Sequence, residues 1–189
     1  MRRIRVFVLF LMLASVPLPA AANEPIVIRF SHVVSPDAPK GKAAAFFAQR
    51  AAELTRGRVR VEVYADSALY SDREEMEALQ LGAVHMLAPS LAKFSVLGAN
   101  GFELFDLPYI FEDRRALRAV TEGDIGERLL ESLEDRGIKG LAFWDNGFKS
   151  FSANTPIRVP SDLAGKRMRI QASRAIEEQM LALGAVPHM

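Results

Sequence analysis

The 189-residue sequence contains no cysteine. Cysteine catalysis, thiolate metal sites and disulfides are therefore excluded, and the fold must be stabilised by its apolar core. The three histidines have no partners at metal-ligand spacing, and the sequence has no G-x-S-x-G elbow, Gly-rich phosphate loop or H-E-x-x-H motif. We therefore expect no metal, no cofactor and no enzymatic activity.

The sequence also lacks an apolar run of about 18 residues, the length of a membrane-spanning helix. The stretch from Val6 to Val16 is shorter, follows three arginines and ends at Pro17. The small residues at 20–22 complete the pattern of a cleaved secretory signal peptide. We expect a signal peptide at residues 1–22 and a soluble, periplasmic mature chain beginning at Asn23.

A concentrated positive charge is absent as well. The predicted signal peptide holds three of the 24 Lys and Arg residues and none of the 23 Asp and Glu residues, so its removal changes the net charge from +1 to −2. A nucleic-acid-binding protein would carry a basic stripe, whereas these charges are interspersed. Nucleic acid is therefore not an expected partner.

The mature chain alternates strand-like and helix-like segments. Apolar or alternating runs predict strands at 26–32, 59–64, 84–88 and 138–144, whereas helical spacing of apolar residues predicts helices that begin near 38, 71, 124 and 173. Each predicted helix ends at a glycine, namely Gly57, Gly82, Gly137 and Gly184. This alternation indicates an α/β fold with mostly parallel sheets, in which ligands bind beyond the carboxyl ends of the strands.

Two cations mark a candidate anion site. In the strand-like run at 166–171, Met168 and Ile170 share one face and Arg169 points to the other. Lys149 lies twenty residues earlier, on a segment that leads into another strand. The planar guanidinium of arginine matches a carboxylate bidentately, so Arg169 is the leading ligand-binding candidate. The alternatives are an internal salt bridge for Arg169 and a solvated side chain for Lys149.

Several motifs, taken together and in order, resemble the substrate-binding proteins of tripartite ATP-independent periplasmic (TRAP) transporters, in particular the C4-dicarboxylate-binding DctP family. The matching segments lie at 30–34, 39–41, 75–82, 88–94, 105–109, 144–149, 152–154 and 167–173. The resemblance implies a two-lobed periplasmic binding protein, type II-like, that captures an organic acid and delivers it to TRAP membrane permease subunits. It also implies that Arg169 pairs with the ligand carboxylate and that Lys149 assists.

Four further residues are weaker candidates for the ligand site. Ser90 and Lys93 lie in the loop after a first-lobe strand, where an α/β lobe presents donors to a ligand, although Lys93 is equally compatible with a surface charge. Asn146 precedes a glycine and is compatible with a turn residue. His32 ends the first strand within a family motif, and its alternative is a satisfied structural histidine.

The resemblance also predicts the domain organisation: a first α/β lobe at 23–146 and the start of a second lobe at 147–189. Because the family continues well past Met189, we expect a truncated chain with an incomplete second lobe. An exported enzyme and a ligand-binding sensor are the alternative functions. Two neighbouring permease genes would favour transport, whereas an adjacent histidine kinase gene would favour sensing.

Overall fold

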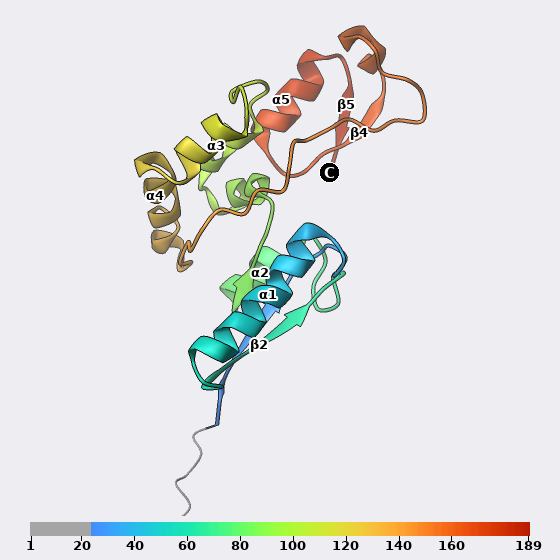
Figure 1. Ribbon diagram of the computed structural model, residues 1–189. Coiled ribbons are helices and arrows are strands. Elements are labelled where there is room, and N and C mark those ends of the chain that lie inside the picture. Colours follow the sequence, from blue (N-terminus) through green and yellow to red (C-terminus); the bar gives the residue numbers. More distant parts are fainter. Residues whose placement is uncertain (1–23) are drawn as a thin grey trace, which may run out of the picture.

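The computed structural model describes residues 24–189, so the predicted signal peptide lies outside the described residues. Helices and strands alternate along the chain, with short 3₁₀ segments (η) between them (Figure 1). The elements are, in chain order, β1 (Ile26–Ser31), α1 (Pro39–Leu54), β2 (Val59–Tyr64), α2 (Glu75–Gln80), β3 (Met86–Leu87), η1 (Leu91–Leu97), η2 (Asn100–Asp106), α3 (Arg114–Thr121), α4 (Asp124–Glu131), η3 (Glu134–Arg136), η4 (Pro160–Leu163), β4 (Arg167–Arg169), α5 (Arg174–Ala182) and β5 (Val186–His188).

The first sheet has the strand order β2-β1-β3, and both pairings are parallel. The alternation of valines in β2 turns one face of the strand toward α1, where Val61 packs with Phe30 and Ala44. Because α1 connects β1 to β2, this part of the chain is the expected β-α-β unit. All carboxyl ends of the sheet therefore point the same way.

A second apolar cluster connects α2 to the helical segments that follow β3. Met76 of α2 packs with Phe94 of η1, Phe102 of η2 and Leu133 beyond α4. The ring centroids of Phe94 and Phe102 lie 4.7 Å apart with the rings tilted by 31°, which is close aromatic packing. This cluster fixes the loop after β3 relative to the start of α2.

The C-terminal part is a second, smaller β-α-β unit, shown in orange and red in Figure 1. β4 and β5 pair in parallel, and α5 packs against them through Met180. Ser173 begins α5 as predicted, because its Oγ accepts a hydrogen bond from the Ile176 amide at 3.4 Å. A third apolar cluster, around Leu163 and Met168, forms the interior of this unit.

The predicted α/β class with parallel sheets is confirmed, and the four predicted helix-ending glycines all have left-handed backbones with φ between +68° and +77°. The strand predicted at 138–144 is wrong. That segment is apolar, but within residues 24–189 no strand lies beside it to accept its backbone hydrogen bonds. It runs instead as irregular chain that exposes Leu141 and Trp144. The division into lobes at residue 146 stays a prediction.

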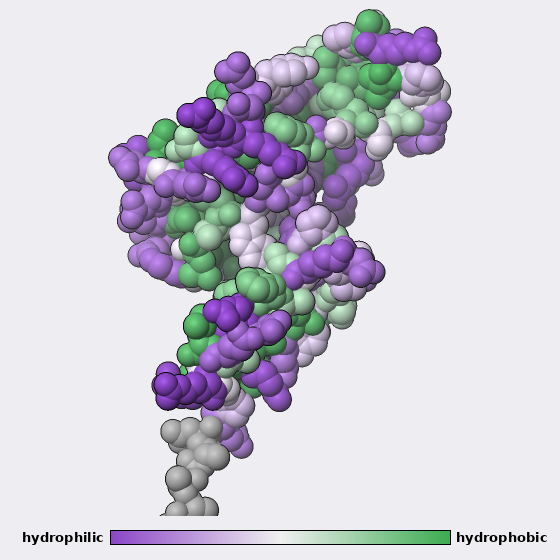
Figure 2. Space-filling model, viewed as in Figure 1, coloured by the Kyte–Doolittle hydropathy of each residue, from purple (hydrophilic) through white to green (hydrophobic). Residues whose placement is uncertain are grey.

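Figure 2 shows hydrophobic and hydrophilic residues interspersed over the face that is visible there. No helix among residues 24–189 is long and apolar enough to cross a membrane.

Candidate functional site

The candidate site lies where the loops after β3 and β4 meet. Ser90, three residues after β3, donates a hydrogen bond from its Oγ to Oε1 of Gln171 at 2.9 Å, although the two residues are 81 positions apart. Gln171 follows β4 in turn. The carboxyl ends of strands from the two sheets are therefore joined side by side, as expected for a ligand site in an α/β protein.

β4 presents Arg169 to this site by simple strand alternation. Met168 and Ile170 point into the third apolar cluster and are buried, so the side chain between them points outward. The Arg169 guanidinium donates from Nη2 to Oδ2 of Asp72 at 3.0 Å, across 97 positions of sequence. About two thirds of its side-chain surface (65%) stays exposed, which leaves it accessible to a ligand.

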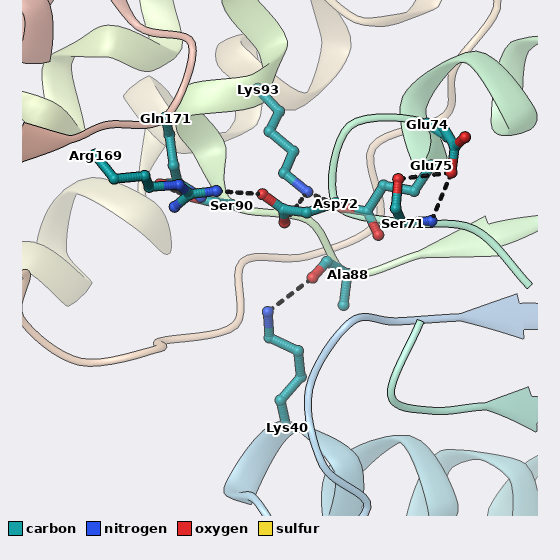
Figure 3. A network of polar contacts seen from close by, with 10 residues as sticks. All are labelled: Lys40, Ser71, Asp72, Glu74, Glu75, Ala88, Ser90, Lys93, Arg169 and Gln171. Carbon is teal, nitrogen blue, oxygen red and sulfur yellow. Dashed lines mark hydrogen bonds and ion pairs between the residues drawn. The ribbon is translucent and has the colours of Figure 1, made fainter. Parts of the chain in front are cut away.

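Lys93 lies beside Asp72 and Arg169, in a cluster of charged side chains, but it is buried among carboxylates (Figure 3). Its Nζ lies 2.5 Å from Oδ1 of Asp72 and also pairs with Glu75, the first residue of α2. Glu75 itself is 1% exposed, so it is a buried carboxylate whose charge Lys93 balances. Lys93 is therefore not the surface charge that the sequence allowed as an alternative, and its role in the ligand site stays a prediction.

The two carboxylates of this cluster have opposite pKa shifts. Burial raises the pKa of Glu75 above its ordinary value, and the opposing hydrogen bond and charge of Lys93 do not overcome it. Burial also acts to raise the pKa of Asp72, but the hydrogen bonds and charges of Lys93 and Arg169 outweigh it and lower that pKa. Asp72 is thus held in its ionised form by the two cations that it bridges.

Lys40, in the first turn of α1, approaches from the other side of the site. Its Nζ donates to the backbone carbonyl of Ala88 at 2.9 Å (Figure 3). Burial lowers the pKa of Lys40; Glu75 acts to raise that pKa and Lys93 to lower it. Charged and amide residues near helix starts and strand ends are ordinarily surface residues, so the sequence did not predict four residues of this site: Lys40, Asp72, Glu75 and Gln171.

The other three predicted residues, Lys149, Asn146 and His32, make no contact with this cluster of charged residues through the hydrogen bonds or ion pairs of the structure. Lys149 pairs with Asp106, a buried aspartate at the end of η2 whose second oxygen, Oδ2, has no hydrogen-bond partner among residues 24–189. The neighbouring Asn146 is exposed, and the Gly147 amide donates to Asp145 Oδ1 at 2.7 Å in a local turn. Lys149 is therefore held by an internal carboxylate, just as Arg169 is held by Asp72.

His32 lies just beyond the end of β1 and is 1% exposed. Its backbone amide donates to the Tyr64 carbonyl at 2.9 Å, whereas neither ring nitrogen has a hydrogen-bond partner among the described residues. Burial lowers the pKa of His32, so its imidazole is neutral at neutral pH.

Within the described part of the chain, no group of three or more His, Cys, Asp or Glu side chains could hold a metal ion. The side chains that the structure gathers at the site are cations, neutral donors and the carboxylates that pair with the cations. A guanidinium, an amide and a hydroxyl are gathered at one edge, with carboxylates behind them. Such a set recognises an anion.

Comparison with known proteins is consistent with this chemistry. Residues 30–189 match the sequence profile of DctP, the bacterial extracellular solute-binding protein family 7. The chain is 63% identical over 171 residues to the C4-dicarboxylate-binding periplasmic protein DctP of Rhodobacter capsulatus, covering 90% of this chain and 51% of that protein.

Two solved structures are also similar. The chain is 46% identical to a TRAP periplasmic solute-binding protein of Sulfurospirillum deleyianum with bound succinate, with a TM-score of 0.82 over 86% of this chain and 53% of that one. It is 45% identical to one of Pseudomonas aeruginosa with bound L-malate, with a TM-score of 0.83 over 87% of this chain and 57% of that one.

The chain belongs to the DctP family of bacterial extracellular solute-binding proteins. The expected two-lobed α/β class is thereby confirmed, and the family consists of solute-binding proteins rather than enzymes. The chain spans about half the length of the curated relatives it matches.

Proposed function

We propose that this chain carries part of the binding site of a TRAP solute-binding protein for a small organic acid, with a C4-dicarboxylate as the leading ligand class. One observation carries the proposal: Arg169 is held at the meeting point of the two strand ends with most of its side chain exposed. Solute-binding relatives with 45% and 46% identity hold malate and succinate, which are both C4-dicarboxylates.

In the proposed complex, the Arg169 guanidinium forms a bidentate pair with one ligand carboxylate. Ser90 and Gln171 supply neutral hydrogen bonds at the same edge, because a hydroxyl and an amide can each turn to a ligand oxygen. His32 offers a further neutral donor from the end of β1. Lys149 and Asn146 extend the site: Lys149 exchanges Asp106 for the ligand's second carboxylate. Lys93 lies behind Asp72 and contributes its positive charge to the site.

The proposed role in transport follows from family membership. A periplasmic binding protein of this class delivers its ligand to TRAP permease subunits in the membrane, and the predicted signal peptide would place the chain in the same compartment. A sensor that uses the same binding fold is the second candidate, and the two differ in the membrane protein that the loaded form contacts.

Calorimetric titration with succinate, L-malate and a monocarboxylate of similar size tests the ligand class. We would titrate the 189-residue chain and a chimaera in which residues 24–189 replace the matching half of the Rhodobacter capsulatus relative. In the chimaera both halves can close on the ligand and exclude water. We expect the dicarboxylates to bind more tightly than the monocarboxylate.

Arg169→Ala should then cost about 3 to 5 kcal/mol in the chimaera, or about two to three and a half decades of affinity, because it leaves a desolvated carboxylate unpaired. Arg169→Lys should lose much of the same affinity, since it keeps the charge but not the planar fork. Arg167→Ala is the matched control, because Arg167 is exposed and makes no salt bridge among the described residues. A loss below about fivefold for Arg169→Ala would refute the proposed ion pair.

A further inference from the structure

The Arg169 guanidinium uses only one of its five N–H groups within the described residues. Nη2 donates to Asp72, and no other acceptor there lies within hydrogen-bond distance of the side chain. A guanidinium that binds a carboxylate through two parallel hydrogen bonds needs one free edge and a fixed orientation of its plane. Asp72 leaves one edge of the guanidinium free and fixes the orientation of its plane.

Asp72 can act as a fixed point because its other oxygen is anchored. Oδ1 pairs with Lys93 at 2.5 Å, and Lys93 is buried and pairs in turn with the buried Glu75. Figure 3 shows the four side chains as a connected row from Arg169 to Glu75. The ammonium of Lys93 therefore holds the Asp72 carboxylate on the body of the protein, and Asp72 holds the arginine.

The charges around Asp72 determine whether it supports Arg169 or competes with the ligand carboxylate for it. A carboxylate paired with Arg169 alone would cancel its charge and compete with the ligand. Asp72 instead divides its charge between Arg169 and Lys93, so Arg169 is only partly neutralised. The row contains two cations and two anions, and Lys40, which interacts with Lys93, Glu75 and Asp72 through its charge, adds one further positive charge. An arriving carboxylate therefore meets a net positive cluster.

We propose that Asp72 is a positioning residue: it holds the Arg169 guanidinium by one Nη nitrogen and orients the remaining edge toward the ligand carboxylate. This inference rests on the proposed function, since it assigns a role to Asp72 in the same dicarboxylate site. Asp72 contacts the arginine and not the ligand, so its effect on binding passes through Arg169.

NMR of the Arg169 side chain in the 189-residue chain tests the inference, with Arg169→Lys identifying the signals. Without any ligand, the Asp72 bond should slow rotation of the guanidinium and give separate Nη signals. Asp72→Asn keeps the shape but not the charge, and it should average these signals. Asp135→Asn is the matched control, because Asp135 is exposed and makes no hydrogen bond or ion pair among residues 24–189. It should change neither the Nη signals nor the succinate affinity.

Titration with succinate, followed on the same signals, supplies the second readout and reaches weak, millimolar affinities. We expect Asp72→Asn to weaken succinate binding about tenfold, since charge-assisted hydrogen bonds are what hold the fork in place. Unchanged or tighter binding by Asp72→Asn would overturn the inference and make Asp72 a competitor of the ligand.

The proposed function and the positioning role of Asp72 can be refuted separately. If succinate leaves the Arg169 signals unmoved both in the 189-residue chain and in the chimaera, the proposed function fails, while the ligand-free Nη signals still decide whether Asp72 orients the arginine. If succinate binds but those signals are already averaged in the wild type, the proposed function stands and the positioning role is refuted.

Discussion

Replacing Lys93 by methionine should destabilise the protein far more than its single charge suggests. Lys93 is buried and is the ion-pair partner of Glu75, whose side chain is 1% exposed. Lys93→Met keeps an unbranched, apolar stem of similar length but leaves the Glu75 carboxylate without a counter-ion in the interior. Breaking a buried pair in this way costs about 3 to 5 kcal/mol.

An exposed pair in the same chain provides the matched control. Lys139 pairs with Glu134, and the two side chains are 70% and 53% exposed. Because solvent screens such a pair, Lys139→Met should cost far less stability than Lys93→Met. At about 2 to 4 °C per kcal/mol for a chain of this size, the Lys93 variant should melt about 6 to 20 °C below the wild type, and the Lys139 variant within a few degrees of it.

The defect of Lys93→Met should also depend on pH. Burial raises the pKa of Glu75 in the folded protein, so the folded state binds this proton more readily than the unfolded state does. Glu75 therefore favours folding below the ordinary pKa of glutamate, and this contribution is lost as the pH rises through the raised pKa. Without Lys93 the loss is larger, so the gap between variant and wild type should be widest at neutral pH and narrow on acidification.

Urea unfolding of the wild type and the variants across this pH range provides the measurement. The double variant Glu75→Gln, Lys93→Met removes both charges and should recover most of the stability at neutral pH, because Asp72 keeps Arg169 as its partner. If Lys93→Met costs no more than Lys139→Met, or if its cost is the same at every pH, Glu75 does not carry a buried charge and the reasoning is refuted.

Three further predictions concern local structure and processing. Gly41→Ala should lower the free energy of unfolding by about 1 to 3 kcal/mol, because the added Cβ would lie 2.4 Å from the Ser35 carbonyl oxygen and 2.7 Å from Pro36 Cα; a rise in melting temperature, as helix propensity alone would give, contradicts it. Ser173→Ala should cost about 0.5 to 2 kcal/mol through loss of the α5 cap, and a change of only a few tenths in urea unfolding would show the cap to be unimportant. N-terminal sequencing of the periplasmic fraction should begin at Asn23, whereas an uncleaved, membrane-bound product would disprove the signal peptide.

The sequence alone predicted the β-α-β units, because strand alternation and helix-ending glycines are local signals. Each of these signals involves residues that are close in sequence. Examples are the valines of β2, the serine that caps α5 and the alternation that turns Arg169 outward. The segment at 138–144 shows the limit of such signals. It has the composition of a strand, but a strand needs a neighbour, and composition does not say whether one lies beside it.

The partners of the charged residues were decided by tertiary structure alone. Arg169 and Lys149 were identified as cations near a site, but only the packed chain brings Asp72 across 97 positions to the first and Asp106 across 43 positions to the second. Burial likewise makes Lys93 the counter-ion of Glu75, a pairing that the residues beside Lys93 in the sequence do not indicate. The physical reason is that charge pairing depends on distance and dielectric in three dimensions, and neither quantity is encoded by a residue's immediate neighbours in sequence.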